Sequence, residues 1–354
     1  MQTSFLMHVT PKQQAMTLYD FLDLQFPFFV KKSWSQVLVA DTVTLQGLPV
    51  IGNPLLKAGD VVAFSLHQYS EPTVNTQWRL YWQNEALLVV HKPANLPVQR
   101  TTRNIYNTLT ALVRRDLHLP EAQPLHRLDL ETAGLVLFAK NKLSTRVWQP
   151  QLKSLLQKKI YQAVVWGKPV WRKYTFTCRL ATQAHSPIRC KMYCTPEHSV
   201  AQPGQKLGKL STTHFTVLKS FTAATGNGRY DQVFSVVACE LQTGRKHQIR
   251  AQLAHLGHPI VGDKIYAHDG SYYLKRLRDA TTEADEQMLL TDHHLLVACS
   301  AQLQGLPERR QEVKVHQKQK VHAQQGIIDN QEGSVQQLIL KDEDYPIAWQ
   351  RFIG

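Results

Sequence analysis

One aspartate in this 354-residue chain stands between an arginine and a turn of small residues, directly before an apolar run. The stretch reads His126-Arg127-Leu128-Asp129-Leu130-Glu131-Thr132-Ala133-Gly134, and Leu135-Val136-Leu137-Phe138-Ala139 follow it. A carboxylate held at the edge of a sheet by such a rigid support suits catalysis, as a nucleophile or a base. From these residues alone, a carboxylate that closes a turn or caps a helix is the commoner explanation of Asp129.

A second polar segment, between Thr243 and Pro259, has the pattern of a helix with its ends marked. Thr243 is predicted to cap the helix, Gly257 to take the left-handed position at its end, and Pro259 to prevent continuation. The residues predicted to face inward are Ile249, Leu253 and Leu256. His247 and Arg250 lie three apart and are expected to share a face. A solvated polar face is the alternative for this pair.

The elements that must position these residues suggest an α+β fold. Helical patterns near 105–117 and 143–157 interrupt the apolar strand-like runs without strict strand-helix-strand alternation. The strand-like runs are 87–90, 134–139, 161–166 and 233–238. We expect a domain at 1–70, a linker at 71–80, a larger domain at 81–300 and a C-terminal extension at 301–354. Residues 183–210 are polar and read as an inserted loop.

The first 70 residues have their own small apolar pattern. Leu18, Phe21 and Leu22 recur at helical spacing, and strand-like residues follow around Val43 and Leu45. A helix, a basic Lys31-Lys32 pair and a small pair of strands together resemble the S4-like RNA-binding module. The resemblance implies that Lys31 and Lys32 contact RNA. The alternative is a small structural domain that does not bind RNA.

The charge of the chain points to a polyanionic partner. Its 41 Lys and Arg exceed 27 Asp and Glu, which gives a net charge of +14. Part of this excess is clustered, for example at Arg245, Lys246 and Arg250, and clustered cations attract phosphates through counterion release. A solvated basic surface is the alternative. No apolar run approaches a membrane span and no leader is evident, so we expect a cytoplasmic protein without membrane association.

The cysteines do not suggest disulfides or a metal site. Five cysteines in so long a chain are sparse and odd in number, which favours reduced thiols. One group has spacing that tetrahedral zinc would tolerate, but it lacks a paired CxxC, and ordinary loop thiols are the preferred explanation. The group is Cys178, His185, Cys190, Cys194 and His198. Motifs for nucleotide phosphates and the serine nucleophile elbow are absent from the sequence.

Taken together, the polar segments resemble the RluA-type family of pseudouridine synthases. His126-Arg127-Leu128-Asp129 with Thr132-x-Gly134-Leu135 is similar to the catalytic-aspartate motif of that family. Its tyrosine motif resembles Lys159-Ile160-Tyr161-Gln162-Ala163 with Gly167. Its third block resembles Thr243-Gly244-Arg245-x-His247-Gln248-Ile249-Arg250, followed by Gly257-His258-Pro259-Ile260-Val261-Gly262-Asp263-x-x-Tyr266. Leu88-Val89-Val90-x-Lys92-Pro93-Ala94 is similar to the opening strand of the catalytic domain, so the likeness covers roughly residues 80–300.

The resemblance implies a mixed, mostly antiparallel sheet with flanking helices, the pseudouridine synthase fold. It also implies isomerisation of uridine to pseudouridine in RNA, without cofactor or metal. Asp129 would be the essential carboxylate, Tyr161 would stack on the uracil, and Arg250 is our candidate for the cation that pairs with Asp129. The residues expected to contact RNA here are His126, Arg127, Arg245 and His247. We expect a monomer acting on ribosomal RNA of the large subunit, with transfer RNA as the other substrate class.

Three positions depart from the family pattern. Ala133 stands where serine is usual, Asn95 where glycine is usual, and 295–298 where a Leu-His-Ala pattern is typical. Two other functions remain open on the sequence. A non-catalytic RNA-binding or ribosome-assembly protein would keep the fold and bind RNA without Asp129. A glycosidase-like hydrolase would use Asp129 with Glu131 and release free uracil.

Overall fold

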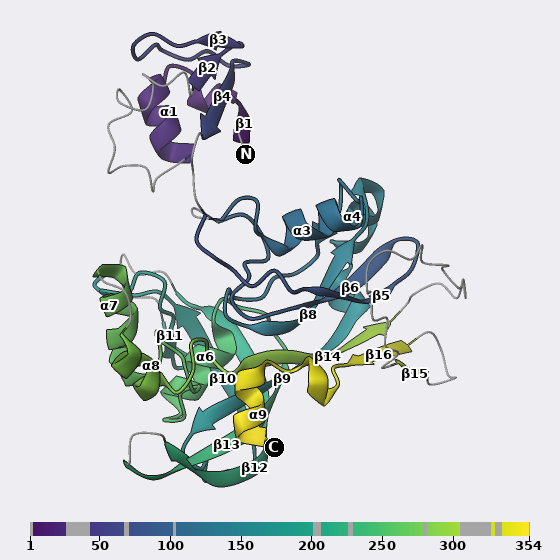
Figure 1. The fold of residues 1–354 in the computed structure, drawn as a ribbon, viewed down its shortest axis with the longest axis vertical. Coiled ribbons are helices and arrows are strands. Elements are labelled where there is room, and N and C mark those ends of the chain that lie inside the picture. Colours follow the sequence, from purple (N-terminus) through teal and green to yellow (C-terminus); the bar gives the residue numbers. More distant parts are fainter. Residues whose placement is uncertain are drawn as a thin grey trace. The chain divides into compact units, whose positions relative to one another are not determined.

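The chain folds into two compact units, seen in a computed structural model (Figure 1). One unit comprises Met1–Thr73 and Arg100–Tyr106, and the other comprises Val74–Gln99 and Asn107–Gly354. The structure describes residues 3–25, 43–66, 71–101, 104–200, 207–225, 229–278, 282–304, 327–329 and 335–353. The stretch expected as a linker, 71–80, runs into the first strand of the larger unit, which begins at Arg79. Among these residues no helix is long and apolar enough to cross a bilayer.

The smaller unit is a four-stranded antiparallel sheet with a helix packed on it. Its strands are β1 (Thr3–His8), β2 (Val43–Leu45), β3 (Leu48–Pro49) and β4 (Val61–Leu66), in the order β1-β4-β2-β3. A 3-10 turn (Pro11–Gln13) leads into α1 (Leu18–Gln25). Leu18, Phe21 and Leu22 are buried, as their helical spacing predicts. Lys31 and Lys32 lie outside the described residues, so the S4-like assignment stays a prediction.

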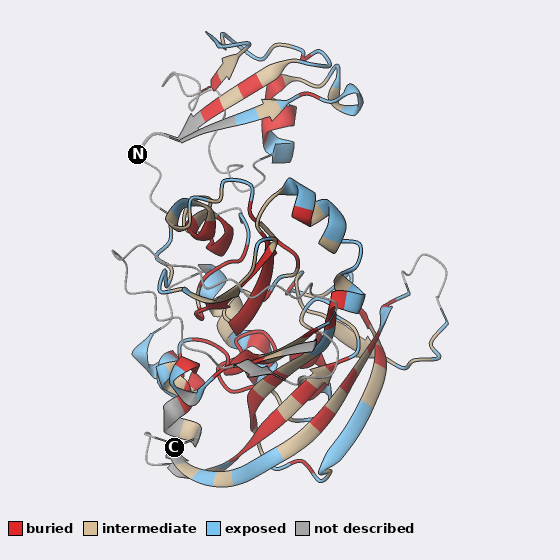
Figure 2. Cartoon of the chain, turned by 90° about the vertical axis from the view of Figure 1, so that its right-hand side faces the viewer, coloured by how far each residue is buried: buried red, intermediate tan, exposed pale blue. Residues whose placement is uncertain are grey.

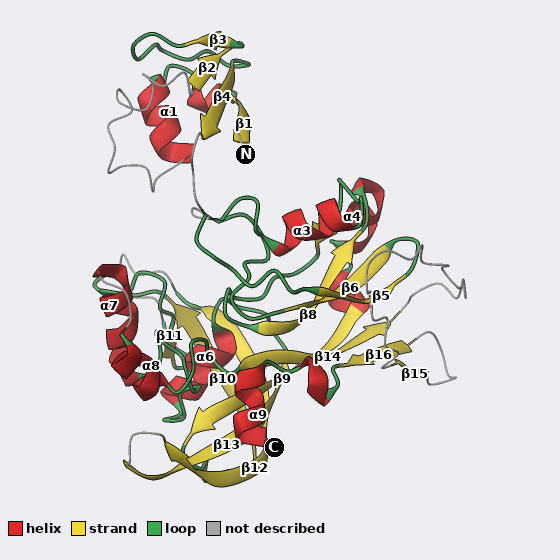
Figure 3. Cartoon of the chain, viewed as in Figure 1, coloured by secondary structure: helices red, strands yellow, loops and turns green. Residues whose placement is uncertain are grey.

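The larger unit is built on one sheet (Figure 3). Within the described residues the main path of strands is β11-β10-β12-β13-β9-β14-β8-β6-β5, with β7 beside β8, and β16 between β14 and β15. The bounds are β5 (Arg79–Gln83), β6 (Leu87–Lys92), β7 (Gln123–Pro124), β8 (Ala133–Ala139), β9 (Leu156–Trp166), β10 (Lys173–Ala181), β11 (Tyr193–Thr195), β12 (Lys209–Thr225), β13 (Arg229–Leu241), β14 (Leu296–Gln304), β15 (Ile327–Asp329) and β16 (Val335–Ile339).

Helices flank this sheet. They are α3 (Leu109–Asp116), α4 (Lys142–Trp148), α5 (Leu152–Leu155), α6 (Gln248–His255), α7 (Ser271–Arg278), α8 (Glu283–Leu289) and α9 (Ile347–Ile353), with 3-10 turns at His268–Gly270 and Asp342–Asp344. Figure 1 shows α7 and α8 near β10 and β11, and α3 and α4 near β6. Figure 2 shows the buried residues gathered in the strands of this unit and on the inner sides of its helices.

The sheet is mixed and mostly antiparallel, which confirms the expected α+β class. Among the described strands β14 pairs with β8 in parallel, and the other pairs are antiparallel. The parallel pair meets at Gly134 and Ala298. Gly134 has φ +118°, and a Cβ there would lie 2.3 Å from the Ala298 carbonyl oxygen. Glycine therefore allows β8 to begin against β14 directly after the Asp129 loop.

The C-terminal segment belongs to the core of the larger unit. β16 pairs with β14 from Ser300 to Gln304, and Trp349 of α9 is fully buried. Phe352 lies edge-on to Phe234 of β13, with ring centroids 5.3 Å apart. Residues 335–353 therefore extend the sheet beside β14 and cover part of its face.

The predicted start of helix α6 is wrong by four residues. The helix begins at Gln248, and its cap is His247 in the left-handed conformation, with φ 54°. Thr243 instead donates to the Gln248 side chain, which also accepts from the Arg245 amide. The Gln248 side chain thus closes residues 243–247 into a loop. The predicted end of the helix holds, because Gly257 has φ +83°.

Candidate active site

Asp129 and Arg250 form the central ion pair of the site. Asp129 lies in the loop before β8, Arg250 lies in the first turn of α6, and Arg250 Nη1 donates to Asp129 Oδ2 at 2.9 Å. The Asp129 side chain is 25% exposed, whereas Arg250 is 5% exposed. Burial acts to raise the pKa of Asp129, but the Arg250 guanidinium, followed by His247 and His294, lowers it to about 2. The carboxylate is therefore ionised at neutral pH and faces a cavity.

A second carboxylate fixes Arg250 from behind. Asp263 is fully buried and accepts two hydrogen bonds from Arg250, from Nε at 2.6 Å and from Nη2 at 2.9 Å. Its Oδ1 also accepts from the Ile265 and Tyr266 amides. Burial acts to raise the pKa of Asp263, but Arg250 lowers it. This bidentate pair sets the plane of the guanidinium and turns its remaining nitrogen toward Asp129.

His247 and Tyr266 close the other side of the ion pair. The Met192 amide donates to the Tyr266 hydroxyl oxygen at 2.8 Å, and that hydroxyl lies 3.1 Å from His247 Nδ1. Donation from Tyr266 to Nδ1 puts the proton of His247 on Nε2, which lies 3.8 Å from Asp129. Burial, and next to it Arg250, lowers the pKa of His247 to about 4. His247 is therefore neutral at pH 7 and offers Asp129 an N–H group.

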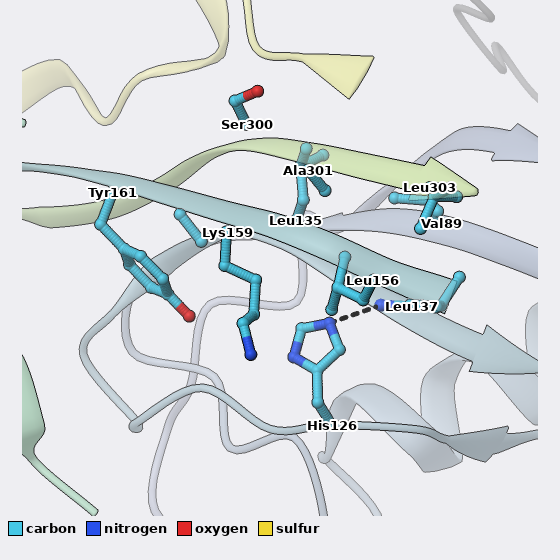
Figure 4. Close-up of a pocket in the computed structure, with 11 residues that line it drawn as sticks. Val89, His126, Leu135, Leu137, Leu156, Lys159, Tyr161, Ser300, Ala301 and Leu303 are labelled. Carbon is cyan, nitrogen blue, oxygen red and sulfur yellow. Dashed lines mark hydrogen bonds between the residues drawn. The ribbon is translucent and has the colours of Figure 1, made fainter. Parts of the chain in front are cut away.

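Tyr161 of β9 borders the same cavity, and it also lines a neighbouring pocket that Figure 4 shows. The side chain is 8% exposed, and it lines the cavity together with Asp129 and Arg250. Burial and the Asp129 charge raise the pKa of Tyr161. The phenol is therefore neutral over the physiological pH range and offers a ring face and a donor hydroxyl.

The backbone beside Asp129 is held by a fully buried lysine. Lys92, at the end of β6, donates to the carbonyl oxygens of Pro93, Leu96 and Leu130 at 2.8–3.0 Å. Burial lowers the pKa of Lys92 to about 7, while the negative charges of Asp129 and Glu131 act to raise it. Because Leu130 directly follows Asp129, the lysine fixes the peptide that carries the carboxylate.

Replacement of Lys92 by methionine is expected to lower the free energy of unfolding by about 3 kcal/mol, because three buried carbonyl groups lose their donor. Urea denaturation measures the change. Lys142→Met is the control, since Lys142 forms an exposed ion pair with Glu121 and its loss is expected to change the free energy of unfolding much less. Equal stability of the two variants would contradict this role for Lys92.

Glu131 belongs to a separate ion network. It accepts from Lys264 Nζ at 3.0 Å, from Arg276 Nη1 at 3.3 Å and from the His294 amide at 3.1 Å. The Thr132 hydroxyl lies 2.7 Å from His294 Nε2. Glu131 therefore anchors the end of the Asp129 loop on the segments around Lys264 and His294.

The cavity at Asp129 opens into a groove of about 810 Å³. One wall carries the turn between α4 and α5, and the other carries the loop that follows β13. The residues that line it are His126, Arg127, Asp129, Gln149, Pro150, Leu152, Lys153, Lys159, Tyr161, Leu241, Gln242, Thr243, Gly244, Arg245 and Lys246. Five of these side chains are cationic and one is acidic, which makes the groove a binding surface for a polyanion.

The structure brings together the three residues predicted to be catalytic, Asp129, Tyr161 and Arg250. Of the residues predicted to contact RNA, Arg127 is exposed in the groove, and Arg245 lines it while its Nε donates to the Leu210 carbonyl. The remaining two residues that were predicted to contact RNA in this unit are histidines, and both are occupied within the fold. His126 Nε2 accepts from the Leu137 amide, and His247 contacts Asp129 and Tyr266 as described above.

Sequence reasoning assigned no role to Asp263, Tyr266 or Lys92, although all three stand inside the quoted motifs. The signal in the sequence that could have indicated them was chemical, because a carboxylate, a phenol and a lysine each stand within or beside an apolar stretch. His294 and the ion network of Glu131 were also missed.

The cysteine-histidine group does not assemble. Cys178 is buried and accepts from Gln252 Nε2, while Cys190 and Cys194 pack against the same small apolar cluster. Among the described residues no three His, Cys, Asp or Glu side chains are arranged to hold a metal ion.

An α+β unit with a buried arginine between two carboxylates, at the floor of a basic groove, has the features of an RNA-modifying enzyme. A family model described as RNA pseudouridylate synthase matches residues 86–255. An uncharacterized RNA pseudouridine synthase, YhcT of Bacillus subtilis, is 30% identical over 234 residues, which cover 64% of this chain and 70% of that protein. The chain therefore belongs to the RluA-type family of RNA pseudouridine synthases, which are isomerases.

Two further relatives carry names that state a substrate. The tRNA pseudouridine(31) synthase of Saccharomyces cerevisiae is 31% identical over 66% of this chain and 62% of that protein. The ribosomal large subunit pseudouridine synthase D of Buchnera aphidicola is 33% identical over 54% of this chain and 55% of that protein. The chain thus spans somewhat less than two thirds of these two relatives.

Proposed function

We propose that this protein isomerises specific uridines in RNA to pseudouridine, with Asp129 as the essential carboxylate. The observation that carries the proposal is the Asp129–Arg250 ion pair beside Tyr161 at the floor of the basic groove. The glycosidic bond between C1′ and N1 breaks, the uracil turns in the pocket, and C5 bonds to C1′ while the proton on C5 leaves and N1 gains one.

Asp129 acts either as a nucleophile or as a base at C2′. Both routes need an ionised carboxylate. Arg250 keeps Asp129 ionised, because it holds the pKa of Asp129 at about 2 despite burial. The His247 Nε2 lies 3.8 Å from the same oxygen, which is beyond hydrogen-bond distance, so Arg250 is the cation that holds the carboxylate. Both routes also need a carboxylate that meets the substrate, which the partial exposure of Asp129 allows.

Tyr161 stacks on the uracil and orients it. Its raised pKa keeps the hydroxyl protonated, so the phenol donates a hydrogen bond and does not act as a free base in the resting enzyme. The target base has to leave the helical stack at a cost of a few kcal/mol. Arg127 is exposed beside Asp129, and its guanidinium is suited to stack in the space that the uridine vacates.

We infer that the substrate is ribosomal RNA of the large subunit. The named function of the Buchnera relative and the expected S4-like unit favour it, and the yeast relative makes transfer RNA the alternative. The proposal includes a cytoplasmic location and a monomeric state, and light scattering of the purified protein tests the monomeric state.

The test is to incubate the protein with unmodified transcripts of large-subunit ribosomal RNA and of transfer RNA, and to map pseudouridine at nucleotide resolution. Conversion at one or a few positions of the ribosomal transcript is expected. Conversion of transfer RNA alone would contradict the substrate, and binding without conversion of either transcript would favour the non-catalytic RNA-binding protein.

Glu131→Gln tests the hydrolase alternative. Because Glu131 is occupied by Lys264 and Arg276, we expect the variant to keep isomerase activity within about 10-fold of the wild type and to lose about 2 kcal/mol of stability. Chromatography of the reaction products measures pseudouridine and free uracil together. Release of uracil by the wild type that stops in the variant would support a hydrolase instead.

A further inference from the structure

Lys159 lies on the same face of β9 as Tyr161. Successive side chains of a strand point to opposite faces, so residues 159 and 161 share one face and Lys158 takes the other. Figure 4 shows Lys159 and Tyr161 extending from one side of the strand, and His126 on a neighbouring segment with its ring pointing toward that side. All three line both the cavity of Figure 4 and the groove that holds Asp129. Lys159 is therefore the cation that β9 directs toward the reacting centre.

The Lys159 ammonium is half-buried, and no carboxylate forms an ion pair with it in the part of the chain that the structure describes. It lies against the loop after β13, where a Cβ added to Gly244 would be 3.9 Å from Nζ. Burial lowers the pKa of Lys159. A cation kept in such a place is costly in the free protein, and an anion that entered the groove beside it would offset that cost.

Asp129, the acidic side chain of the groove, does not serve as that anion because Arg250 already binds it. His126 does not attract an anion by charge, because its ring is neutral. Burial and the nearby Lys159 lower the pKa of His126 to about 4, so its ring is neutral, and Nε2 accepts from the Leu137 amide. The ring proton is then on Nδ1, which leaves a neutral donor beside the ammonium.

We propose that Lys159 binds a backbone phosphate that flanks the extruded uridine, an inference that rests on the proposed function. Two residues along a strand lie about 6.6 Å apart at the backbone, so a base that stacks on Tyr161 has its flanking phosphates within reach of the long Lys159 side chain. Phosphate is the anion that RNA carries at this distance from every base. The contact fixes the nucleotide after it has left the stack, whereas the exposed cation Lys153 meets flanking phosphates in solvent.

The test combines a protein change with a neutral linkage in the RNA. The substrate is the shortest RNA that the wild type converts, made with a methylphosphonate either 5′ or 3′ of the target uridine. Lys159→Met is expected to lower kcat/KM about 10- to 100-fold on the natural linkage, the value of one charge-assisted hydrogen bond. Lys158→Met is the matched control, because it removes the same charge from the opposite, exposed face, and it is expected to stay within about twofold.

On the RNA that carries the neutral linkage at the contacted phosphate, kcat/KM of the wild type is expected to fall to the value of Lys159→Met. The kcat/KM of the variant is expected to be the same on this RNA as on the natural RNA. Additive losses for both linkages would overturn the contact, and so would a Lys159→Met variant that equals the wild type. Dissociation constants for the same panel give the same comparison without turnover. Absence of conversion by the wild type would contradict the proposed function, and the Lys159 contact is then decided by the same comparison of dissociation constants on the shortest RNA that the wild type binds. Thermal melting confirms that each variant is folded.

Discussion

Asp129→Asn is expected to abolish pseudouridine formation, with kcat reduced by roughly four orders of magnitude or more, as for the loss of a nucleophile or general base in other enzymes. Asparagine has the shape of aspartate but neither attacks a sugar nor accepts a proton at neutral pH. The measurement is a single-turnover assay on an RNA that the wild type converts, followed until the wild-type reaction is complete.

RNA binding and folding are the controls for this variant. Arg250 keeps its bidentate pair with Asp263, so we expect the variant to stay folded, with a melting temperature lowered by the loss of one of the two carboxylate partners of Arg250. The dissociation constant for RNA is expected to stay within a few-fold, because the groove cations are unchanged. A variant that still forms pseudouridine at a tenth of the wild-type rate would contradict the essential role of Asp129. Lost RNA binding would point instead to a carboxylate that only shapes the groove.

The parts of the fold that the sequence predicted well are those in which a local pattern decides the structure. The spacing of Leu18, Phe21 and Leu22 predicted α1, and the apolar run before Lys140 predicted β8. The start of α6 was missed because a competing interaction decided it. The Gln248 side chain binds Thr243 and the Arg245 amide, and nothing in helix propensity shows such a loop.

The sequence predicted the candidate catalytic residues but not the buried residues that hold them in place. Asp129 and Arg250 are 121 positions apart, and only their motifs brought them together before the fold was known. Asp263 was not distinguished, because a fully buried carboxylate becomes recognisable only once its partners are seen. The same holds for Lys92, whose partners are backbone carbonyls and therefore carry no signal in the sequence.

The two buried cations of the site are stabilised in the same way. Arg250 and Lys92 each have several fixed acceptors, which offset part of the cost of burying their charges. The acceptors lie on segments that are far apart along the chain, namely the Asp129 loop, the turn after β6 and the segment around Asp263. Folding of the larger unit thus assembles the carboxylate, its counter-ion and their supports in one step. Loss of one charge is expected to disturb both stability and catalysis.

Arg250→Met should show this coupling most strongly. The change leaves Asp263 fully buried without its cation and Asp129 without its main partner, and removal of one partner from a buried pair costs about 3–5 kcal/mol. Activity is expected to be lost with it, because burial then raises the pKa of Asp129 instead of Arg250 lowering it. Arg250→Lys is the conservative comparison, and it is expected to be intermediate because lysine keeps the charge but not the fork.

The stability penalty of Arg250→Met is expected to depend on pH. In the wild type the folded pKa of Asp129 is lowered from 3.8 to about 2, so its contribution to stability is fully present above about pH 4 and is lost as the pH falls toward 2. In Arg250→Met the folded pKa values of both carboxylates lie above their unfolded values. The penalty is then largest at neutral pH and shrinks as the carboxylates take up protons. Urea denaturation at pH 5 and pH 8 measures the difference, and an equal penalty at both would contradict the assignment.

A double variant separates the stability of the site from its chemistry. In Arg250→Met with Asp263→Asn the buried carboxylate is removed together with its cation, so we expect part of the lost free energy of unfolding to return. Activity is not expected to return, because Asp129 still lacks the guanidinium that keeps it ionised and oriented. A folded, RNA-binding and inactive double variant would assign Arg250 to the reaction itself. A double variant that recovered wild-type turnover would show that Arg250 serves only to neutralise Asp263.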